Sequence, residues 1–388
     1  MLHKDIQYFI NENLNTDSVA LVLKGSPFET VTIQELLEQI EAKSRCEKKL
    51  PTWFKAENIY YPNKLNIEQT SSEETASYKA SLIEGNSLID ITGGFGVDCF
   101  YFAKHIKQVT HCELNAQLSE LVTHNFNQLQ ANIETIAQDG LEVLKSASQT
   151  FDWVYVDPSR RHEQKGKVFF LKDCLPNVPE HLDFLFNKTA NILIKTSPLL
   201  DISAGLNELK HVKTIHCVAV NNEMKELLWV LENDYHGAIA VKTVNLKAKG
   251  NEYFDFELEA ESNIYPELSD PRSYLYEPNS AVMKSGGFNS ICKVFGVKKL
   301  HPFSHLYTSE SLIEDFPGRK FKVENVVDYN KKNLKHLTNS KANIATRNFP
   351  ETVENIRKKH KIKDGGNSFI FFTTNSNGTK VVITCSKA

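Results

Sequence analysis

Short apolar runs recur through the middle of the chain, and each is followed by a turn and then by a segment with helical spacing. The expected strands lie near residues 87–90, 108–113, 133–138, 152–157, 191–196, 214–220 and 238–246. The expected helices lie near residues 96–106, 116–130, 140–147, 179–188 and 201–210. This alternation predicts a parallel sheet covered on both faces. The last strand pair is expected to add an antiparallel edge strand, because residues 223–232 are too polar for a covering helix.

The two ends of the chain follow other patterns. Apolar positions spaced by three and four predict helices over residues 5–13 and 33–42. Two capping boxes are expected, namely Thr32 with Glu35 and Ser71 with Glu74, the second opening a helix that runs to about residue 83. Beyond residue 319 the pattern predicts strand, helix, strand, helix and a closing hairpin.

These patterns predict an α/β chain with a Rossmann-like, seven-stranded sheet, a helical N-terminal part and a small α+β C-terminal domain. The expected boundaries are 1–83 for the helical region, 84–250 for the sheet domain, 251–318 for a connector with a small segment, and 319–388 for the last domain.

A glycine-rich turn after the first strand is the most informative stretch of the chain. The strand ends in Asp90, and the residues that follow it are Thr92, Gly93, Gly94, Phe95, Gly96 and, at the start of a helix, Asp98. Glycine allows a ligand to approach the backbone, and the helix N-terminus offers free N–H groups. The spacing departs from the Gly-x-Gly-x-x-Gly dinucleotide pattern. Asp90 would repel a pyrophosphate but suits the amino end of a methionine-type cofactor, which favours S-adenosylmethionine over NAD.

Three further strands also end in an acid. Glu113, followed by Leu114, lies 23 positions after Asp90, close to the offset of about 20 expected for a carboxylate that binds ribose hydroxyls. Asp139, followed by Gly140, is placed to accept a hydrogen bond from an adenine amino group, although Asp-Gly also simply makes turns. Asp157 precedes Pro158 at the end of the fourth strand. Four acids in order at one end of a sheet predict a cofactor site.

This set of residues resembles the class I S-adenosylmethionine-dependent methyltransferases, and more closely a bacterial group that ends in a ferredoxin-like segment and a THUMP-like domain. Residues 68–76 are also similar to the helix that precedes the first motif of that group. The resemblance implies that Asp90 and Gly93–Gly96 hold the methionine end, that Glu113 binds the ribose and Asp139 the adenine. It also implies that Asp157 and Pro158 line the methyl-transfer pocket.

The residues after this pair depart from the pattern of amino-directed methyltransferases, which carry Pro and an aromatic residue there. This chain has Ser159, Arg160 and Arg161, so the target atom is left open. Arginine suits bidentate phosphate binding, and a plain charged surface loop is the alternative. Lys195 ends the fifth strand on the same rim and either shapes the acceptor pocket or merely precedes a proline stop at Pro198. We count Ser159, Arg160, Arg161 and Lys195 as candidate substrate-binding residues.

Composition describes an ordinary globular protein of 388 residues, 41% hydrophobic and 24% charged. No apolar run approaches the roughly 18–20 residues of a membrane span, and no signal core is seen, so a cytoplasmic location is expected. Seven scattered cysteines form no Cys-x-x-Cys pair, so we expect neither a metal nor disulfides, and buried thiols instead. No membrane partner is expected, and the sequence does not indicate an oligomeric state.

The net charge of −3 hides an asymmetry between the two ends of the chain. Residues 319–388 contain 15 Lys and Arg against 5 Asp and Glu, a balance of +10, so the preceding residues carry −13. A basic terminal module on an acidic body favours RNA as partner, and a merely solvated face is the alternative.

Three functions therefore stay open besides a less favoured NAD enzyme. The first is an S-adenosylmethionine-dependent methyltransferase acting on RNA. In it, Asp157 positions the acceptor or accepts a proton late in the transfer, the alternative being that it merely caps the following turn. The second is a small-molecule methyltransferase whose basic module only oligomerises or covers the pocket. The third is a non-catalytic protein that binds S-adenosylmethionine or RNA.

Overall fold

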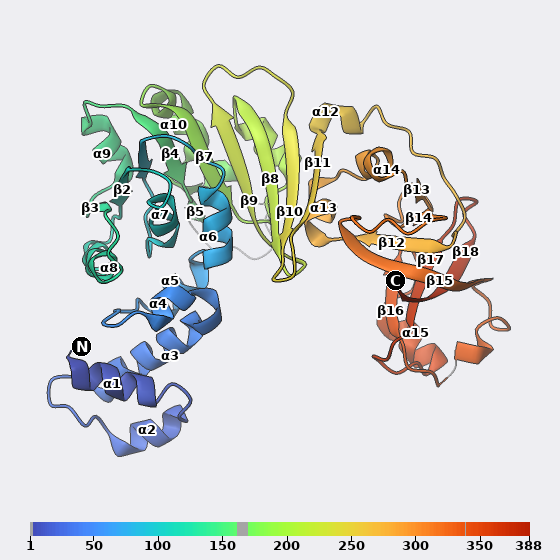
Figure 1. Cartoon of the computed structure of the whole chain (residues 1–388), viewed down its shortest axis with the longest axis horizontal. Helices are drawn as coiled ribbons and strands as arrows, with labels where there is room; N and C mark the ends of the chain where they lie inside the picture. The colour runs from blue at the N-terminus through green and yellow to red at the C-terminus, as the bar shows by residue number, and fades with distance from the viewer. Residues whose placement is uncertain (1–2, 161–169, 338) are drawn as a thin grey trace. The chain divides into compact units, whose positions relative to one another are not determined.

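The structure is a computed structural model that describes residues 3–160, 170–337 and 339–388. The chain divides into two compact units (Figure 1). Unit 1 comprises residues 1–213 and 228–236, and unit 2 comprises residues 214–227 and 237–388. Each unit is described separately below.

Unit 1 begins with six helices, drawn in blue in Figure 1. They are α1 (Lys4–Glu12), α2 (Ser18–Lys24), α3 (Ile33–Lys49), α4 (Pro51–Lys55), α5 (Lys64–Gln69) and α6 (Glu73–Ala80). The expected capping box of α3 is confirmed, because Thr32 and Glu35 bond each other's backbone N–H groups. The cap of α6 is Ser72 rather than Ser71, since Ser72 Oγ accepts from the Thr75 N–H at 3.3 Å. Ser71 instead takes part in the site described below.

The large sheet has nine strands in the order β11-β10-β8-β9-β7-β4-β1-β2-β3. Their bounds are β1 (Ser87–Asp90), β2 (Gln108–Cys112), β3 (Glu134–Ile136), β4 (Phe151–Val156), β7 (Thr189–Thr196), β8 (Val212–Val220), β9 (Glu223–Glu232), β10 (Ala240–Leu246) and β11 (Glu252–Glu257). The helices between them are α7 (Val97–Phe102), α8 (Ala116–Gln128), α9 (Gly140–Ser146), α10 (Val178–Phe186) and α11 (Ile202–Glu208). The expected α/β class with a parallel Rossmann-like sheet is confirmed.

Two strands beyond the seven expected ones explain the size of the sheet. Residues 223–232 form β9, because the polar start of this segment is followed by Leu227–Leu231, whose leucines and Trp229 are fully buried. The strand pair β8 and β10 is parallel, so the antiparallel edge expected there is wrong. The antiparallel edge strand is β11, which pairs with β10 and was expected to be an extended connector.

Strand β1 lies between β2 and β4, and both neighbours run parallel to it. Asp90 is in register with His111 of β2 and with Tyr155 of β4. The carboxyl ends of the three strands therefore meet at one edge of the sheet, where open α/β sheets bind their ligands. Beyond β4, the short strand β5 (Ser159–Arg160) pairs with β6 (Cys174–Leu175), which follows the 3₁₀ turn η1 (Leu171–Asp173).

Unit 2 contains a second sheet, of seven strands in the order β13-β14-β12-β15-β18-β17-β16. Its strands are β12 (Tyr274–Pro278), β13 (Lys298–Lys299), β14 (Tyr307–Ser309), β15 (Gly318–Asp328), β16 (Asn343–Arg347), β17 (Phe369–Thr374) and β18 (Lys380–Lys387). Its helices are α12 (Leu258–Glu261), α13 (Ser280–Ser285), α14 (Ser290–Phe295), η2 (Lys335–Leu337) and α15 (Val353–His360). The closing hairpin of β17 and β18 is confirmed, whereas the first helix expected beyond residue 319 is limited, among the described residues, to the short turn η2.

All seven cysteines are free thiols in the structure and are buried, and burial is what is expected of thiols that act as small apolar side chains. In the described ranges, no helix has the length and apolar character needed to cross a bilayer. The same ranges contain no cluster of three His, Cys, Asp or Glu side chains that could hold a metal ion.

Candidate cofactor and methyl-transfer site

The glycine-rich turn, Gly93–Gly96, is shaped by two constraints that exclude side chains. Gly94 and Gly96 have φ values of +57° and +77°, a region that favours glycine. A Cβ on Gly93 would lie 2.3 Å from His111 Nε2, and one on Gly96 would lie 2.5 Å from Phe126 Cζ. A Cβ on Gly94, by contrast, would have one contact within 4 Å among the described residues, the Thr92 carbonyl oxygen at 3.8 Å. The turn is therefore packed tightly on one side and leaves backbone open at Gly94, as a cradle for a ligand requires.

Glu113, at the end of β2, is tied directly to this turn. Its Oε2 accepts from the Gly94 N–H at 2.9 Å, and its Oε1 accepts from the Asn115 N–H at 2.8 Å. The carboxylate is only partly buried, and the neighbouring Leu114 side chain is exposed. Glu113 therefore stands beside the open part of the turn, and its contact with a ribose stays a prediction.

Asp139 and Gly140 open helix α9 on the same edge. Asp139 is exposed and caps the helix, accepting from the Leu141 N–H at 2.8 Å and the Glu142 N–H at 3.3 Å. A Cβ on Gly140 would lie 2.4 Å from the Cα of Ile91, so the start of α9 lies directly against the residue that follows β1. The structure thus brings this pair close to the glycine turn, and the adenine contact stays a prediction.

Asp90 is buried behind the turn rather than exposed in front of it. Its side chain is 2% exposed, and it accepts hydrogen bonds from the Thr92 N–H at 2.8 Å, the Thr92 hydroxyl at 3.1 Å and the Cys99 thiol at 3.3 Å. Burial raises the pKa of Asp90 to about 7, although the bonds from Thr92 and Cys99 oppose this shift. Asp90 therefore positions Thr92, and its contact with the amino end of a cofactor stays a prediction.

This raised pKa predicts a pH-dependent stability. Between pH 3.8 and about 7 the folded chain keeps a proton on Asp90 that the unfolded chain releases, so the Asp90 contribution to stability falls as the pH rises through this window. We expect the free energy of unfolding of the wild type, relative to Asp90→Asn, to fall by at most about 1.4 kcal/mol per pH unit there. Urea denaturation of both proteins at several pH values measures this difference, and parallel curves would contradict it.

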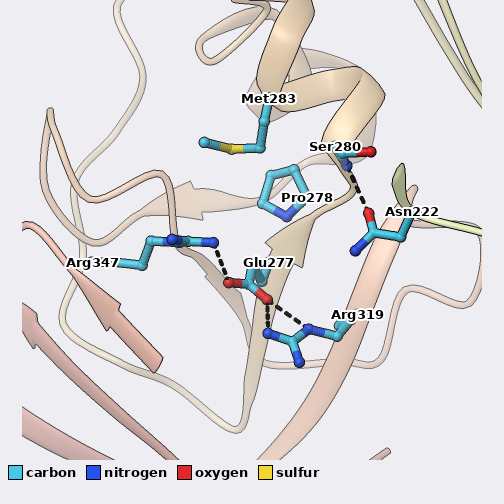
Figure 2. A pocket seen from close by; sticks show the side chains of 7 residues that line it. All are labelled: Asn222, Glu277, Pro278, Ser280, Met283, Arg319 and Arg347. Atoms are coloured by element: carbon cyan, nitrogen blue, oxygen red, sulfur yellow. Dashed lines mark hydrogen bonds and ion pairs between the residues drawn. The ribbon is translucent and has the colours of Figure 1, made fainter. Parts of the chain in front are cut away.

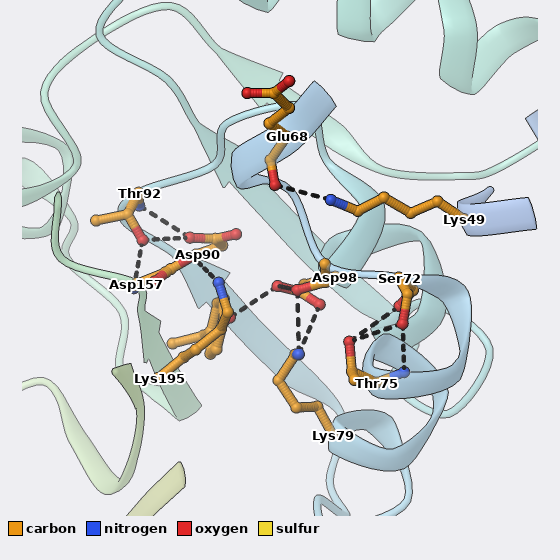
Figure 3. A network of polar contacts seen from close by, with 12 residues as sticks. Lys49, Glu68, Ser72, Thr75, Lys79, Asp90, Thr92, Asp98, Asp157 and Lys195 are labelled. Carbon is orange, nitrogen blue, oxygen red and sulfur yellow. Dashed lines mark hydrogen bonds and ion pairs between the residues drawn. The ribbon is translucent and has the colours of Figure 1, made fainter. Parts of the chain in front are cut away.

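Asp157 meets the turn from the neighbouring strand β4. Its N–H donates to the Thr92 hydroxyl at 2.7 Å, and its carboxylate forms an ion pair with the Lys195 ammonium at the end of β7 (Figure 3). The Lys195 side chain is 13% exposed and that of Asp157 is 34% exposed, so the carboxylate keeps an open side. The structure thus joins Asp90, Thr92, Asp157 and Lys195 in one network.

The remaining candidates follow Asp157 along the chain. Pro158 is buried, Ser159 is exposed, and Ser159 and Arg160 form β5 rather than the expected loop. Arg161 lies outside the described residues. Phe95 is 3% exposed, and its ring centroid lies 6.2 Å from that of Trp53, so it anchors the turn to helix α4.

Asp98 anchors a second, buried network that the sequence did not indicate. Its carboxylate forms an ion pair with Lys79 of α6 at 3.2 Å and accepts from the Ser71 hydroxyl at 2.9 Å and the Tyr155 hydroxyl at 2.8 Å. The Lys79 side chain is fully buried. Burial opposes the charge on Asp98, but Lys79 and Lys195 outweigh it and hold the pKa of Asp98 below its usual range. The pair Lys79–Asp98 therefore fastens helix α6 to the start of α7 behind the glycine turn (Figure 3).

Sequence reasoning singled out neither Lys79 nor Tyr155 as part of the site. Tyr155 is 1% exposed, but its hydroxyl is a polar end that a buried tyrosine must satisfy. That requirement was the one available signal for Tyr155. Lys79 offered none, because a lysine in a helix is usually solvated and its partner lies 19 positions away.

Comparisons with known proteins give two domain matches and one match over nearly the whole chain. Two family models match unit 2: a ferredoxin-like domain at residues 274–317 and a THUMP domain-like model at residues 318–387. No protein of curated function matches the chain. The crystal structure of a "putative methyltransferase" from Porphyromonas gingivalis W83 is 31% identical, covers 99% of this chain and 98% of its own, and has a TM-score of 0.90.

Smaller solved structures match only part of the chain. An rRNA methylase from Streptococcus thermophilus is 16% identical over 41% of this chain and 93% of its own, with a TM-score of 0.30. The TrmK protein of M. capricolum, in complex with S-adenosyl-homocysteine, is 18% identical over 42% of this chain and 69% of its own, with a TM-score of 0.33. The assignment therefore depends on the full-length match and the two domain models.

That match extends over nearly the whole of both chains, and the two domain models follow one another directly over residues 274–387. The chain belongs to the family of the Porphyromonas gingivalis protein, the class I S-adenosylmethionine-dependent methyltransferases that carry a ferredoxin-like and a THUMP-like domain.

Proposed function

We propose that this chain is a cytoplasmic enzyme that methylates an RNA base with S-adenosylmethionine as the methyl donor. When bound, the cofactor supplies a methyl group on a sulfonium that is already activated. The protein therefore has to orient the acceptor rather than generate a strong nucleophile. The observation that carries this proposal is the Thr92–Asp157 hydrogen bond of 2.7 Å, which holds an acidic strand end against the cofactor turn.

The hydrogen-bond acceptors around the turn suit the proposed cofactor. Carboxylates accept hydrogen bonds from ribose hydroxyls and from an adenine amino group, and Glu113 and Asp139 lie on the same edge of the sheet. The space beside the Gly94 Cα is open to a ligand, while the Gly94 N–H is held by Glu113. Asp157, beside this backbone, would orient the acceptor or accept its proton.

The basic C-terminal end of the chain supports RNA as the acceptor. Residues 319–388 carry a balance of +10, and nearly all of this charge falls within the THUMP-like match at residues 318–387. Lysine and arginine that neutralise phosphates release counterions, so binding should weaken steeply as salt rises.

Glu113→Gln should weaken the binding of S-adenosylmethionine by about 10-fold or more. The substitution removes the charge of an acceptor, and hydrogen bonds to charged groups contribute about 1.5–3 kcal/mol. Isothermal calorimetry with the full chain measures the affinity. Glu142→Gln is the matched control, because Glu142 is exposed and pairs only with Lys145 on the surface of α9. Equal affinities of the two variants would contradict a role of Glu113 in the site.

The acceptor class is tested by methyl transfer. Wild-type protein with methyl-labelled S-adenosylmethionine is incubated separately with total RNA and with an RNA-free small-molecule extract, and RNA nucleosides are then analysed by mass spectrometry. We expect label in RNA, and filter binding of RNA that falls as salt rises. Label confined to the small-molecule extract would favour a small-molecule methyltransferase. Cofactor binding without any transfer would favour a non-catalytic protein.

A further inference from the structure

A cavity of about 320 Å³ lies in unit 2, and none of the seven residues that line it takes part in the proposed methyl transfer (Figure 2). Glu277 lies near the end of β12, Met283 lies on α13, and Arg319 and Arg347 come from β15 and β16. The first two belong to the ferredoxin-like match and the two arginines to the THUMP-like match. The cavity is therefore built by both C-terminal domains together.

Glu277 holds both guanidinium groups in place. Its side chain is 4% exposed, and it accepts from Arg319 Nε at 2.6 Å, from Arg319 Nη2, and from Arg347 Nη2 at 2.7 Å. One buried carboxylate faces two arginines, so the cluster carries a net charge of +1. Because the arginines are fixed before any ligand arrives, a bound anion does not have to order them.

Both arginines keep donors for a further acceptor. Their side chains are 49% and 38% exposed, so they reach the cavity and solvent. Within the described residues Glu277 is the one hydrogen-bond partner of either guanidinium, which has five N–H donors. The Nε of Arg347 is itself buried without a partner. A buried donor of this kind calls for an acceptor, and the described part of the chain does not supply one.

Neighbouring groups make the region electropositive. Burial and the nearby charges of Lys299 and Arg347 lower the pKa of His305 to about 4. Burial and the charges of Lys380 and Lys299 also lower the pKa of His301. Both histidines are therefore mostly neutral at pH 7, and the lining itself contains two arginines against one acid, Glu277.

The lining also limits the size and kind of ligand. Pocket volumes for small ligands begin at about 300 Å³, which suits one nucleotide and excludes a folded helix. Pro278 and Met283 form an apolar wall, against which a base can pack. Asn222 accepts from the Ser280 N–H through its Oδ1 at 2.7 Å, so its amide NH₂ group is left as a donor. Planar guanidinium groups match phosphate oxygens in a bidentate way.

We propose that this cavity binds one phosphodiester-linked nucleotide of the RNA substrate, with the phosphate on Arg319 and Arg347 and the base against Met283. This inference rests on the proposed action on RNA. It identifies the place where an unpaired nucleotide of that RNA is held, in addition to the general charge of the C-terminal end.

The test uses the full chain and a 12-nucleotide single-stranded RNA of mixed sequence, with affinity measured by fluorescence anisotropy at several salt concentrations. Arg347→Gln should weaken binding about 10-fold and lower the slope of log affinity against log salt by about 1. Arg347→Lys should keep the salt dependence of binding, because the charge remains. It should still weaken binding, because an ammonium lacks the planar pair of N–H donors with which a guanidinium binds phosphate. Lys358→Gln, which removes one exposed charge on α15, should change the affinity less than about 2-fold.

A second pair of variants leaves the Glu277 cluster intact. Met283→Glu places a carboxylate in the wall and should abolish most of the binding, whereas Met283→Gln, of the same size, should keep it. Circular dichroism establishes that each variant is folded. If both arginine and Met283 variants bind the RNA as the wild type does, the inference is overturned.

Two further arms separate this inference from the proposed function and from other phosphate sources. In the first arm, the wild type transfers methyl groups to RNA, and the cavity variants bind RNA as tightly as the wild type does. This result would refute RNA binding by the cavity and leave the proposed methyltransferase function standing. If the wild type neither binds nor methylates any RNA, the proposed action on RNA is refuted, whatever the cavity variants show. In the second arm, uridine monophosphate and inorganic phosphate are tested as ligands. If either binds the wild type tightly and binds Arg347→Gln weakly, while RNA binding is the same in both proteins, the cavity is a site for a free nucleotide or phosphate. That result would overturn the RNA proposal.

Discussion

Replacing Lys79 by methionine should lower the free energy of unfolding by about 3–5 kcal/mol. The Lys79 side chain is fully buried, and its ammonium lies 3.2 Å from Asp98 Oδ1. Without it, the buried Asp98 carboxylate loses an ion-pair partner, and the Lys195 charge and the hydroxyls of Ser71 and Tyr155 remain to stabilise it. Guanidinium denaturation followed by tryptophan fluorescence measures the loss.

The double variant Lys79→Met with Asp98→Asn separates the charge from the packing. Removing both charges together should recover much of the lost stability, because no unpaired charge is then buried. Lys145→Met is the matched control, since Lys145 forms an exposed ion pair with Glu142 and should change the stability by less than about 1 kcal/mol. A cost for Lys79→Met as small as that of the control would show that Asp98 does not depend on Lys79.

Asp157→Asn should lower kcat for methyl transfer about 100-fold while the affinity for S-adenosylmethionine changes little. The carboxylate lies at the open end of β4 and is held by the Lys195 ammonium and the Thr92 hydroxyl. Loss of its charge would misplace the acceptor or remove the group that takes its proton, and effects of this size are typical of both. Steady-state kinetics with the RNA identified by methyl labelling gives kcat and KM.

Lys195→Met distinguishes this role from a merely structural one. It breaks the same ion pair but leaves the Asp157 carboxylate in place. We expect it to raise the KM for RNA more than it lowers kcat, because Lys195 lies on the rim where the acceptor enters. If the two variants lower kcat equally, Asp157 acts only as the partner of Lys195, and its proposed part in methyl transfer is wrong.

Local patterns predicted the elements of the sheet domain well because their signals lie within a dozen residues. A β-branched run followed by an acid and glycines specifies a strand, a turn and a helix start without reference to the rest of the chain. The error at β9 shows the limit of this reasoning. The segment begins with polar residues and continues with the buried run Leu227–Leu231, so its average composition is too polar for a covering element. Only the packing of the whole sheet shows that the first part is exposed and the second part is buried.

The candidate site was predicted in outline but not in its contacts. The four acids at the strand ends could be found because parallel strands bring their carboxyl ends to one edge. Their environments could not be found in this way. Asp90 is buried against Thr92 and Cys99, whereas Glu113 is partly exposed beside Gly94, and nothing in the two local sequences distinguishes these cases.

The order of residues alone therefore determined the alternation of strands and helices, the glycine turn and the row of acids, since each is a property of neighbouring positions. Tertiary structure alone decided that Lys79 neutralises Asp98, that Lys195 pairs with Asp157, and that Glu277 joins two arginines 42 and 70 positions away. Such pairs depend on the strand order and on which groups are removed from water together, and both of these are set only when the whole chain packs.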